Sequence, residues 1–308
     1  MNSAAEKLLL VGDNPFHGIS HLSQERVRDR GNSITTATYA AGLVATSVEN
    51  GANGFMFSVS DTTLSILRMV KSPKNNPLNL YALVPYAYEY VRLATHAGGI
   101  SGLARQFARQ VAFSGNFKVA ALGLKGILRT DLQELMKAYL AYEISRIRSS
   151  AKRNGVLRSV LLHEVITDMA LALDLDWLFK SYIGFIRQYG ITPGFETRNF
   201  AYLVKRFKEW NLDFSEILIA TPFNKIGFQM NPSIEECERA LAKVPESNVI
   251  AMSVLAAGYL KLPEATEYIK TLPNLKGLVV GVSKERQACE TFEFLEKNLV
   301  LPCTEEKN

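Results

Sequence analysis

The sequence predicts an α/β fold, a (β/α)8 TIM barrel with a long helical insertion after its third strand. Three observations predict it: the length of 308 residues, eight short apolar runs, and a segment of helical periodicity after each run. Continuous apolar runs are typical of parallel strands that are buried on both faces. The expected strands are Leu8–Gly12, Gly54–Ser60, Leu80–Pro85, Ser159–His163, Thr192–Glu196, Ile217–Pro222, Val249–Leu255 and Gly277–Val282.

A doubly wound sheet is the alternative fold, but it usually has five or six strands. No G-x-G-x-x-G motif follows the first expected strand, as dinucleotide binding in that fold would require. No repeat, low-complexity tract or linker divides the chain. We therefore expect residues 1–308 to form a single barrel domain.

The composition excludes several classes of protein. With 47% hydrophobic and 21% charged residues, the chain is neither disordered nor fibrous. Its three cysteines are few and far apart, which predicts neither a disulfide framework nor a cysteine-rich metal site. The apolar run at 8–11 is too short for a signal peptide, and no stretch is long enough to span a membrane. We expect a soluble, cytoplasmic protein without a transmembrane segment.

Helix starts are marked by residues that cap helices well. Asn32 or Ser33 is expected to cap the first helix, Asp61 the second, and Ser233 the helix that begins IEECERAL. The side-chain oxygen of each would accept a hydrogen bond from a backbone N–H in the first helical turn.

The third unit contains the insertion, residues 86–158, in which three helices are expected at 87–97, 100–113 and 132–153. Between Ile100 and Arg153 lie ten Lys/Arg and three Asp/Glu, so this part carries +7 and the rest of the chain −2. It could be a solvated basic excursion, a lid that attracts an anionic ligand, or a surface for anionic lipid or a homo-oligomer partner. Few aromatic residues lie among the basic ones, so we expect no nucleic-acid binding.

Ionisable residues cluster where the expected strands end. Asp13 and His17 follow the first strand, Tyr86 follows the third, and His163 and Glu196 end the fourth and fifth. In a TIM barrel these ends form the rim where ligands bind. We therefore expect the five residues to converge as acid–base groups, with metal ligation as an alternative role for some of them.

Two of these assignments rest on local arguments. His163 and Glu164 are adjacent, so only one can point into the barrel, and His163 continues the alternation of VLLH. Glu196 ends an apolar strand, and a buried carboxylate needs a partner or a catalytic role.

The eighth unit predicts an anion-binding site. Gly281 and Ser283 end a strand, and Lys284 and Arg286 fall in the first turn of the next helix. Free backbone N–H groups, the helix dipole and two cations would together hold a phosphate. The alternative is a surface helix capped by Ser283.

Several motifs resemble those of the aldo-keto reductases. VLLHEV resembles their fourth strand, which ends in the catalytic histidine, here His163. The segments around Asn199, Asn224 and Ser253 resemble their fifth-, sixth- and seventh-strand motifs. VGVSKERQACETFEFL resembles the segment that holds the adenosine phosphates of NADPH. The resemblance implies a TIM barrel and NADP as cofactor, with Ser283, Lys284 and Arg286 at the phosphate positions.

The chain departs from that family at the positions of its chemistry. Ser58 stands where the catalytic aspartate is expected, no lysine ends the third strand, and Ala220 replaces the glutamine beside the nicotinamide. An altered active site is therefore expected.

Four functions follow from these observations. The first is an enzyme that acts on a small anionic or phosphorylated metabolite, with His163 and Glu196 sharing acid–base work with Asp13 or His17. The second is an NADPH-dependent oxidoreductase with a non-standard proton donor such as Tyr86. The third is a non-catalytic binding or regulatory protein that uses the basic insertion. The fourth is a metal-dependent hydrolase or lyase.

Overall fold

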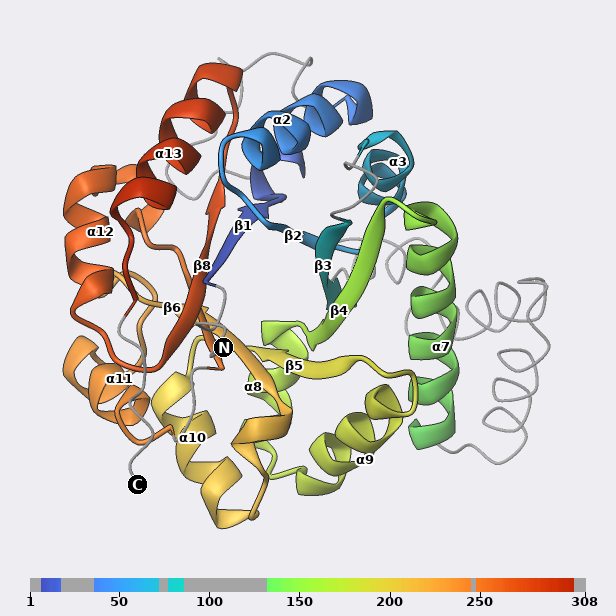
Figure 1. The fold of residues 1–308 in the computed structure, drawn as a ribbon. Helices are drawn as coiled ribbons and strands as arrows, with labels where there is room; N and C mark the ends of the chain where they lie inside the picture. The colour runs from blue at the N-terminus through green and yellow to red at the C-terminus, as the bar shows by residue number, and fades with distance from the viewer. Residues whose placement is uncertain (1–6, 18–35, 72–76, 86–131, 245–247, 302–308) are drawn as a thin grey trace, which may run out of the picture.

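The chain forms a closed barrel of eight parallel strands with helices around the outside (Figure 1). The computed structural model describes residues 7–17, 36–71, 77–85, 132–244 and 248–301. Strands pair in chain order, and β8 closes the ring against β1. The strands are β1 (Leu8–Gly12), β2 (Gly54–Ser58), β3 (Leu78–Val84), β4 (Gly155–Leu162), β5 (Thr192–Glu196), β6 (Leu218–Pro222), β7 (Val249–Met252) and β8 (Leu275–Gly281). The predicted (β/α)8 fold is confirmed.

The helices follow the strands in turn. Two follow β4: α8 begins directly at the rim, and α9 packs along the barrel against β5. The helices are α2 (Ala37–Glu49), α3 (Asp61–Met69), α7 (Leu132–Ala151), α8 (Glu164–Ala172), α9 (Asp176–Arg187), α10 (Phe200–Glu209), α11 (Ile234–Leu241), α12 (Leu262–Lys270) and α13 (Glu285–Asn298).

Alternate residues of each strand enter two separate apolar clusters. One cluster fills the barrel and includes Leu10, Leu161 and Ile250; the other lies between the strands and the helices and includes Val11, Leu162 and Phe195. Both faces of the strands are thus buried, which is why the sequence shows continuous apolar runs. This alternation also decides which residues at the strand ends point into the barrel.

Six of the eight predicted strands differ from the observed ones at one or both ends, and β4 and β7 differ most. β4 begins at Gly155 rather than Ser159, and β7 ends at Met252 rather than Leu255. The backbone of Ser253 has a φ of +51°, a left-handed conformation that terminates the extended strand.

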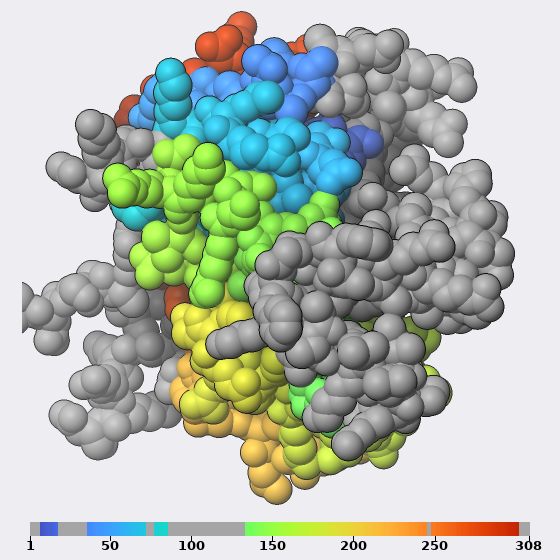
Figure 2. All heavy atoms as spheres, turned by 90° about the vertical axis from the view of Figure 1, so that its right-hand side faces the viewer, coloured from blue at the N-terminus to red at the C-terminus, as the bar shows by residue number. Residues whose placement is uncertain are grey.

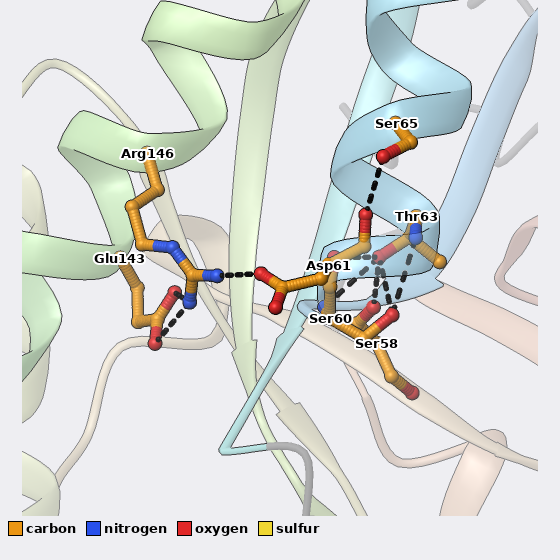
Figure 3. A network of polar contacts seen from close by, with 7 residues as sticks. All are labelled: Ser58, Ser60, Asp61, Thr63, Ser65, Glu143 and Arg146. Atoms are coloured by element: carbon orange, nitrogen blue, oxygen red, sulfur yellow. Dashed lines mark hydrogen bonds and ion pairs between the residues drawn. The ribbon is translucent and has the colours of Figure 1, made fainter.

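The predicted cap of the second helix was wrong. Ser60 caps α3: its hydroxyl accepts the Thr63 N–H at 3.2 Å, and Thr63 Oγ1 accepts the Ser60 N–H in return (Figure 3). Asp61 is instead the first helical residue, and its exposed carboxylate pairs with Arg146 of α7 at 2.6 Å. Arg146 also binds the buried carboxylate of Glu143, so this chain of charges joins α3 to α7.

The other two cap predictions had different outcomes. Ser233 is confirmed, because its hydroxyl accepts the Glu236 N–H at 3.3 Å. The assignment of Asn32 or Ser33 was wrong, since α2 begins at Ala37 and the Thr36 hydroxyl accepts the Tyr39 N–H.

The insertion lies between β3 and α7. α7 begins at Leu132, as the third predicted helix of this region does, and packs against α3 (Figure 2). It is therefore the outer helix that connects β3 to β4 in the barrel. The helices predicted at 87–97 and 100–113 fall outside the described residues. No helix in the described ranges has the length and apolar character needed to cross a membrane.

Candidate active site

His163 and Glu196 face each other at the carboxyl end of the barrel. His163 follows β4 in alternation with Leu161, and Glu196 ends β5 in alternation with Gly194, so both point into the barrel. His163 Nε2 lies 3.9 Å from Glu196 Oε2, and both side chains are largely buried. The structure therefore brings together two of the five predicted acid–base residues.

The environment of His163 favours a neutral ring with its proton on Nε2. His163 is the N-cap of α8, and its Nδ1 accepts the backbone N–H of Val165 at 3.2 Å. An acceptor nitrogen carries no proton, so the proton of the neutral ring sits on Nε2, the atom nearest Glu196. Burial lowers the pKa of His163, and the nearby Arg198 acts in the same direction.

Glu196 is a buried carboxyl group with an unusual proton affinity. Burial, with the negative charge of Glu164 as a further cause, raises the pKa of Glu196 to about 8. Its Oε2 accepts the backbone N–H of Glu164 at 3.2 Å, which partly offsets the rise. Glu196 can therefore hold or release a proton close to neutral pH.

Asp13 and His17 lie on the same rim and contact each other. Buried Asp13 accepts hydrogen bonds from the Ser58 N–H at 2.7 Å and from His17 Nε2 at 3.1 Å. The negative charge of Asp13 raises the pKa of both His163 and Glu196, so the four predicted residues share one electrostatic environment. Through its hydrogen bond from the Ser58 N–H, Asp13 joins the ends of β1 and β2.

Glu164, Asp168 and Arg198 lie on this side of the rim. The sequence offered Glu164 only as the alternative to His163, and it did not predict roles for Asp168 and Arg198. Arg198 forms an ion pair with Glu164. Asp168 of α8 accepts the Thr197 hydroxyl and the Arg198 N–H, which ties α8 to the loop after β5. Burial raises the pKa of Asp168. The only sequence signal for Glu164 and Arg198 was their place directly after strand ends.

Two residues of the predicted anion site after β8, Ser283 and Arg286, are engaged by the protein's own groups. Gln287 Oε1 accepts both the backbone N–H of Ser283, at 2.9 Å, and its hydroxyl. A Cβ on Gly281 would lie 2.9 Å from the Pro15 ring, so the chain itself occupies the space beside this glycine. Arg286 is exposed and pairs with Glu290 at 2.6 Å.

The predicted position of Lys284 was wrong. It is the N-cap of α13 rather than a residue of its first turn, which begins with the acidic Glu285. An acidic residue there disfavours a bound anion, because it already interacts with the positive end of the helix dipole.

The other predicted cofactor-binding residues also have internal partners. The Asn224 side chain bonds both the N–H and the carbonyl of Phe228 within the loop after β6, and it is fully buried. Asn199 donates to Asp168 at 3.0 Å, and the Ser253 hydroxyl donates to Gln229 at 3.4 Å. In the observed conformation, these side chains bond to other groups of the chain instead of being exposed for NADPH.

The remaining predictions concern Tyr86 and metal ions. Tyr86 lies outside the described residues. Within the ranges that the structure describes, no three His, Cys, Asp or Glu side chains are grouped so as to hold a metal ion.

Comparisons with known proteins identify the fold. No protein-family model and no curated protein matches the chain. Two solved structures, both described as a "putative aldo-keto reductase" from Pseudomonas aeruginosa, each share 12% sequence identity with it at a TM-score of 0.55. Each match covers 95% of this chain, and 91% and 90% of the respective relative. At this identity the likeness shows the fold alone, an aldo-keto-reductase-like TIM barrel, as the sequence motifs predicted.

Proposed function

We propose that the protein is an acid–base enzyme that moves a proton on a small anionic carbonyl compound. One observation carries the proposal: a buried carboxyl with a pKa of about 8, Glu196, lies 3.9 Å from the Nε2 of a largely buried histidine. A general acid–base group works best when its pKa is near the operating pH. Clusters of perturbed ionisable groups at the rim of a TIM barrel are typical of catalytic sites.

The two side chains would have different roles. In its ionised form, Glu196 would take a proton from the carbon next to the substrate carbonyl; the C–H bond breaks and the proton moves to the Glu196 carboxylate. The electron pair moves to the carbonyl oxygen, where His163 Nε2–H would donate a hydrogen bond to the developing negative charge. A neutral imidazole suits this task, because it donates without being a strong acid. Asp13 and His17 would hold the neighbouring strand ends.

Solvent exchange tests the proposal without knowledge of the natural substrate. Small carbonyl acids and their phosphorylated counterparts would be incubated with the protein in D2O, and loss of the C–H signal followed by proton NMR. We expect at least one compound to exchange, and Glu196→Gln to slow the exchange by about a hundredfold or more. The matched control is Glu209→Gln, an exposed carboxylate that pairs with Arg206 on α10. Equal exchange by wild type and Glu196→Gln would overturn the proposal.

An NADPH-dependent oxidoreductase is the second candidate, supported by the barrel fold and by the position of His163 after β4. Binding at the predicted phosphate positions would require the Gln287 side chain to leave Ser283. A titration with NADPH, followed by quenching of Trp177 and Trp210 fluorescence, tests it. Saturation at micromolar NADPH would favour this candidate, whereas the absence of a saturable signal would count against it.

A binding or regulatory role of the basic insertion rests mostly on residues 86–131, outside the described part of the chain. It would be supported if deletion of 100–131 changed the oligomer size or liposome association.

A further inference from the structure

Arg198 lies on the rim beside the His163–Glu196 pair, and its side chain is held in place. Its Nε–H donates to the Glu164 carboxylate, and its backbone N–H donates to Asp168 Oδ2 at 3.2 Å. Glu164 in turn donates its own backbone N–H to Glu196. The guanidinium is therefore connected to the proposed catalytic carboxyl through a single residue.

Most of the hydrogen-bonding capacity of Arg198 is unused. Its Nε–H is engaged by Glu164, but neither terminal Nη group has a hydrogen-bond partner among the described residues. The side chain is 26% exposed, and neither Nη atom is among the buried unpaired side-chain atoms, so these groups are accessible to solvent. The two Nη groups of a guanidinium form a planar fork that matches the two oxygens of a carboxylate.

The charges around Arg198 indicate which anion would bind. Besides Glu196, three carboxylates, those of Glu164, Asp168 and Asp13, lie on the same rim. A ligand with one negative charge can be attracted by Arg198, whereas a second charge would be repelled by its neighbours. The positive charge of Arg198 lowers the pKa of both His163 and Glu196, which places it within electrostatic reach of the reacting groups.

We infer that Arg198 is the anion-recognition residue of the site and binds a monoanionic carboxylate of the substrate through its two Nη groups. The inference rests on the proposed function, because it names the substrate class of the same pocket: a carbonyl compound that carries its carboxylate near the carbonyl. Glu164, which accepts the Nε–H of Arg198, is then a positioning residue for the guanidinium. The anion site would then lie in the loop after β5, and not after β8 where the sequence predicted it.

Binding of oxamate tests the inference. Oxamate carries one carboxylate beside a carbonyl group; ethyl oxamate is its neutral ester, and inorganic phosphate is the competing anion. Dissociation constants would be measured by ligand-observed NMR. We expect oxamate to bind wild type at least tenfold more tightly than either of the others. Arg198→Gln should weaken oxamate binding at least tenfold, and Arg198→Lys should weaken it less, because it keeps the charge without the fork.

Control variants separate a binding role from a folding defect. Arg187→Gln removes an exposed arginine that pairs with Glu216 on the barrel exterior and should leave oxamate binding within twofold of wild type. Circular dichroism melts should show Arg198→Gln folded. Arg286→Gln tests the rival site: a loss of oxamate binding there would overturn the inference.

The outcomes distinguish this inference from the proposed function. Unchanged oxamate binding in Arg198→Gln, or no preference for oxamate over its ester and phosphate, would overturn the role of Arg198 whatever the exchange assay shows. If Arg198→Gln loses oxamate while Glu196→Gln exchanges deuterium like wild type, the anion site stands and the acid–base function fails. If both hold, Glu196→Gln should still bind oxamate within about threefold of wild type.

Discussion

Two parts of the barrel rim, the end of β8 and the ends of β4 and β5, offered similar sequence signals and have different structures. After β8, the Gln287 side chain accepts the N–H of Ser283, and Pro15 fills the space beside Gly281. Arg286 pairs with Glu290 at the exposed surface. After β4 and β5, Glu196 is buried with a raised pKa, and Arg198 keeps two terminal groups without a partner in the described chain.

The two regions differ in whether their charged and polar side chains have nearby partners. Polar groups after β8 pair locally with residues four positions later, Ser283 with Gln287 and Arg286 with Glu290. An exposed ion pair such as the second adds little stability. Among the described residues, no Lys or Arg forms an ion pair with Glu196, and burial makes its charged form costly, so its pKa rises. We therefore assign the proposed reaction to the β4–β5 side because of this uncompensated burial, rather than because of the number of charged residues.

The largest expected effect is on catalysis by Glu196. Glu196→Gln should lower the exchange rate of an active compound by about 10²–10⁴-fold, the usual contribution of a general acid–base group. In wild type, the rate should rise with pH and level off above about 8, because the ionised form accepts the proton. A rate that is flat from pH 6 to 9 would remove Glu196 from the reaction.

His163 should matter nearly as much, and in a different way. His163→Ala removes the Nε2–H donor and should cost about 10²-fold in rate, as the loss of one oxyanion donor does. His163→Asn caps helices well, so it should restore most of the stability of α8 without restoring the rate. If His163→Asn recovered the full rate, His163 would be a helix cap only.

A third effect needs no substrate and appears in the pH dependence of stability. The pKa of Glu196 is about 8 in the folded chain, against 4.5 for an ordinary glutamate. Between these values the folded state binds the proton and the unfolded state does not, so the free energy of unfolding falls as pH rises. The slope is at most about 1.4 kcal/mol per pH unit. Urea unfolding at several pH values should show this decline in wild type and a weaker one in Glu196→Gln. Parallel curves would contradict the raised pKa.

The fold was predictable because burial on both faces leaves a strong, local pattern. Two strands, Leu8–Gly12 and Thr192–Glu196, have their predicted bounds, and His163 was placed inward by alternation alone. The site was only partly predictable. That Gln287 would occupy Ser283, or that Pro15 would cover Gly281, depends on side-chain contacts that no periodicity encodes. The sequence did not predict a role for Arg198, because that role depends on its unpaired Nη groups. Only coordinates show which groups are unpaired.

The smallest effect concerns the β8 side. Gln287→Ala would free the N–H and the hydroxyl of Ser283, and we expect binding of inorganic phosphate to tighten a few-fold. Phosphate-induced chemical-shift changes in wild type and variant would measure this. If wild type bound phosphate tightly and Gln287→Ala bound it less tightly, the anion site would lie after β8 and not after β5.

A carbon-13 NMR titration of the glutamate carboxyl groups tests the central claim most directly, with the Glu196 resonance assigned by its absence in Glu196→Gln. Our account predicts a midpoint near pH 8 for this carboxyl in the free protein. A midpoint near 4.5, that of an ordinary solvated glutamate, would contradict it.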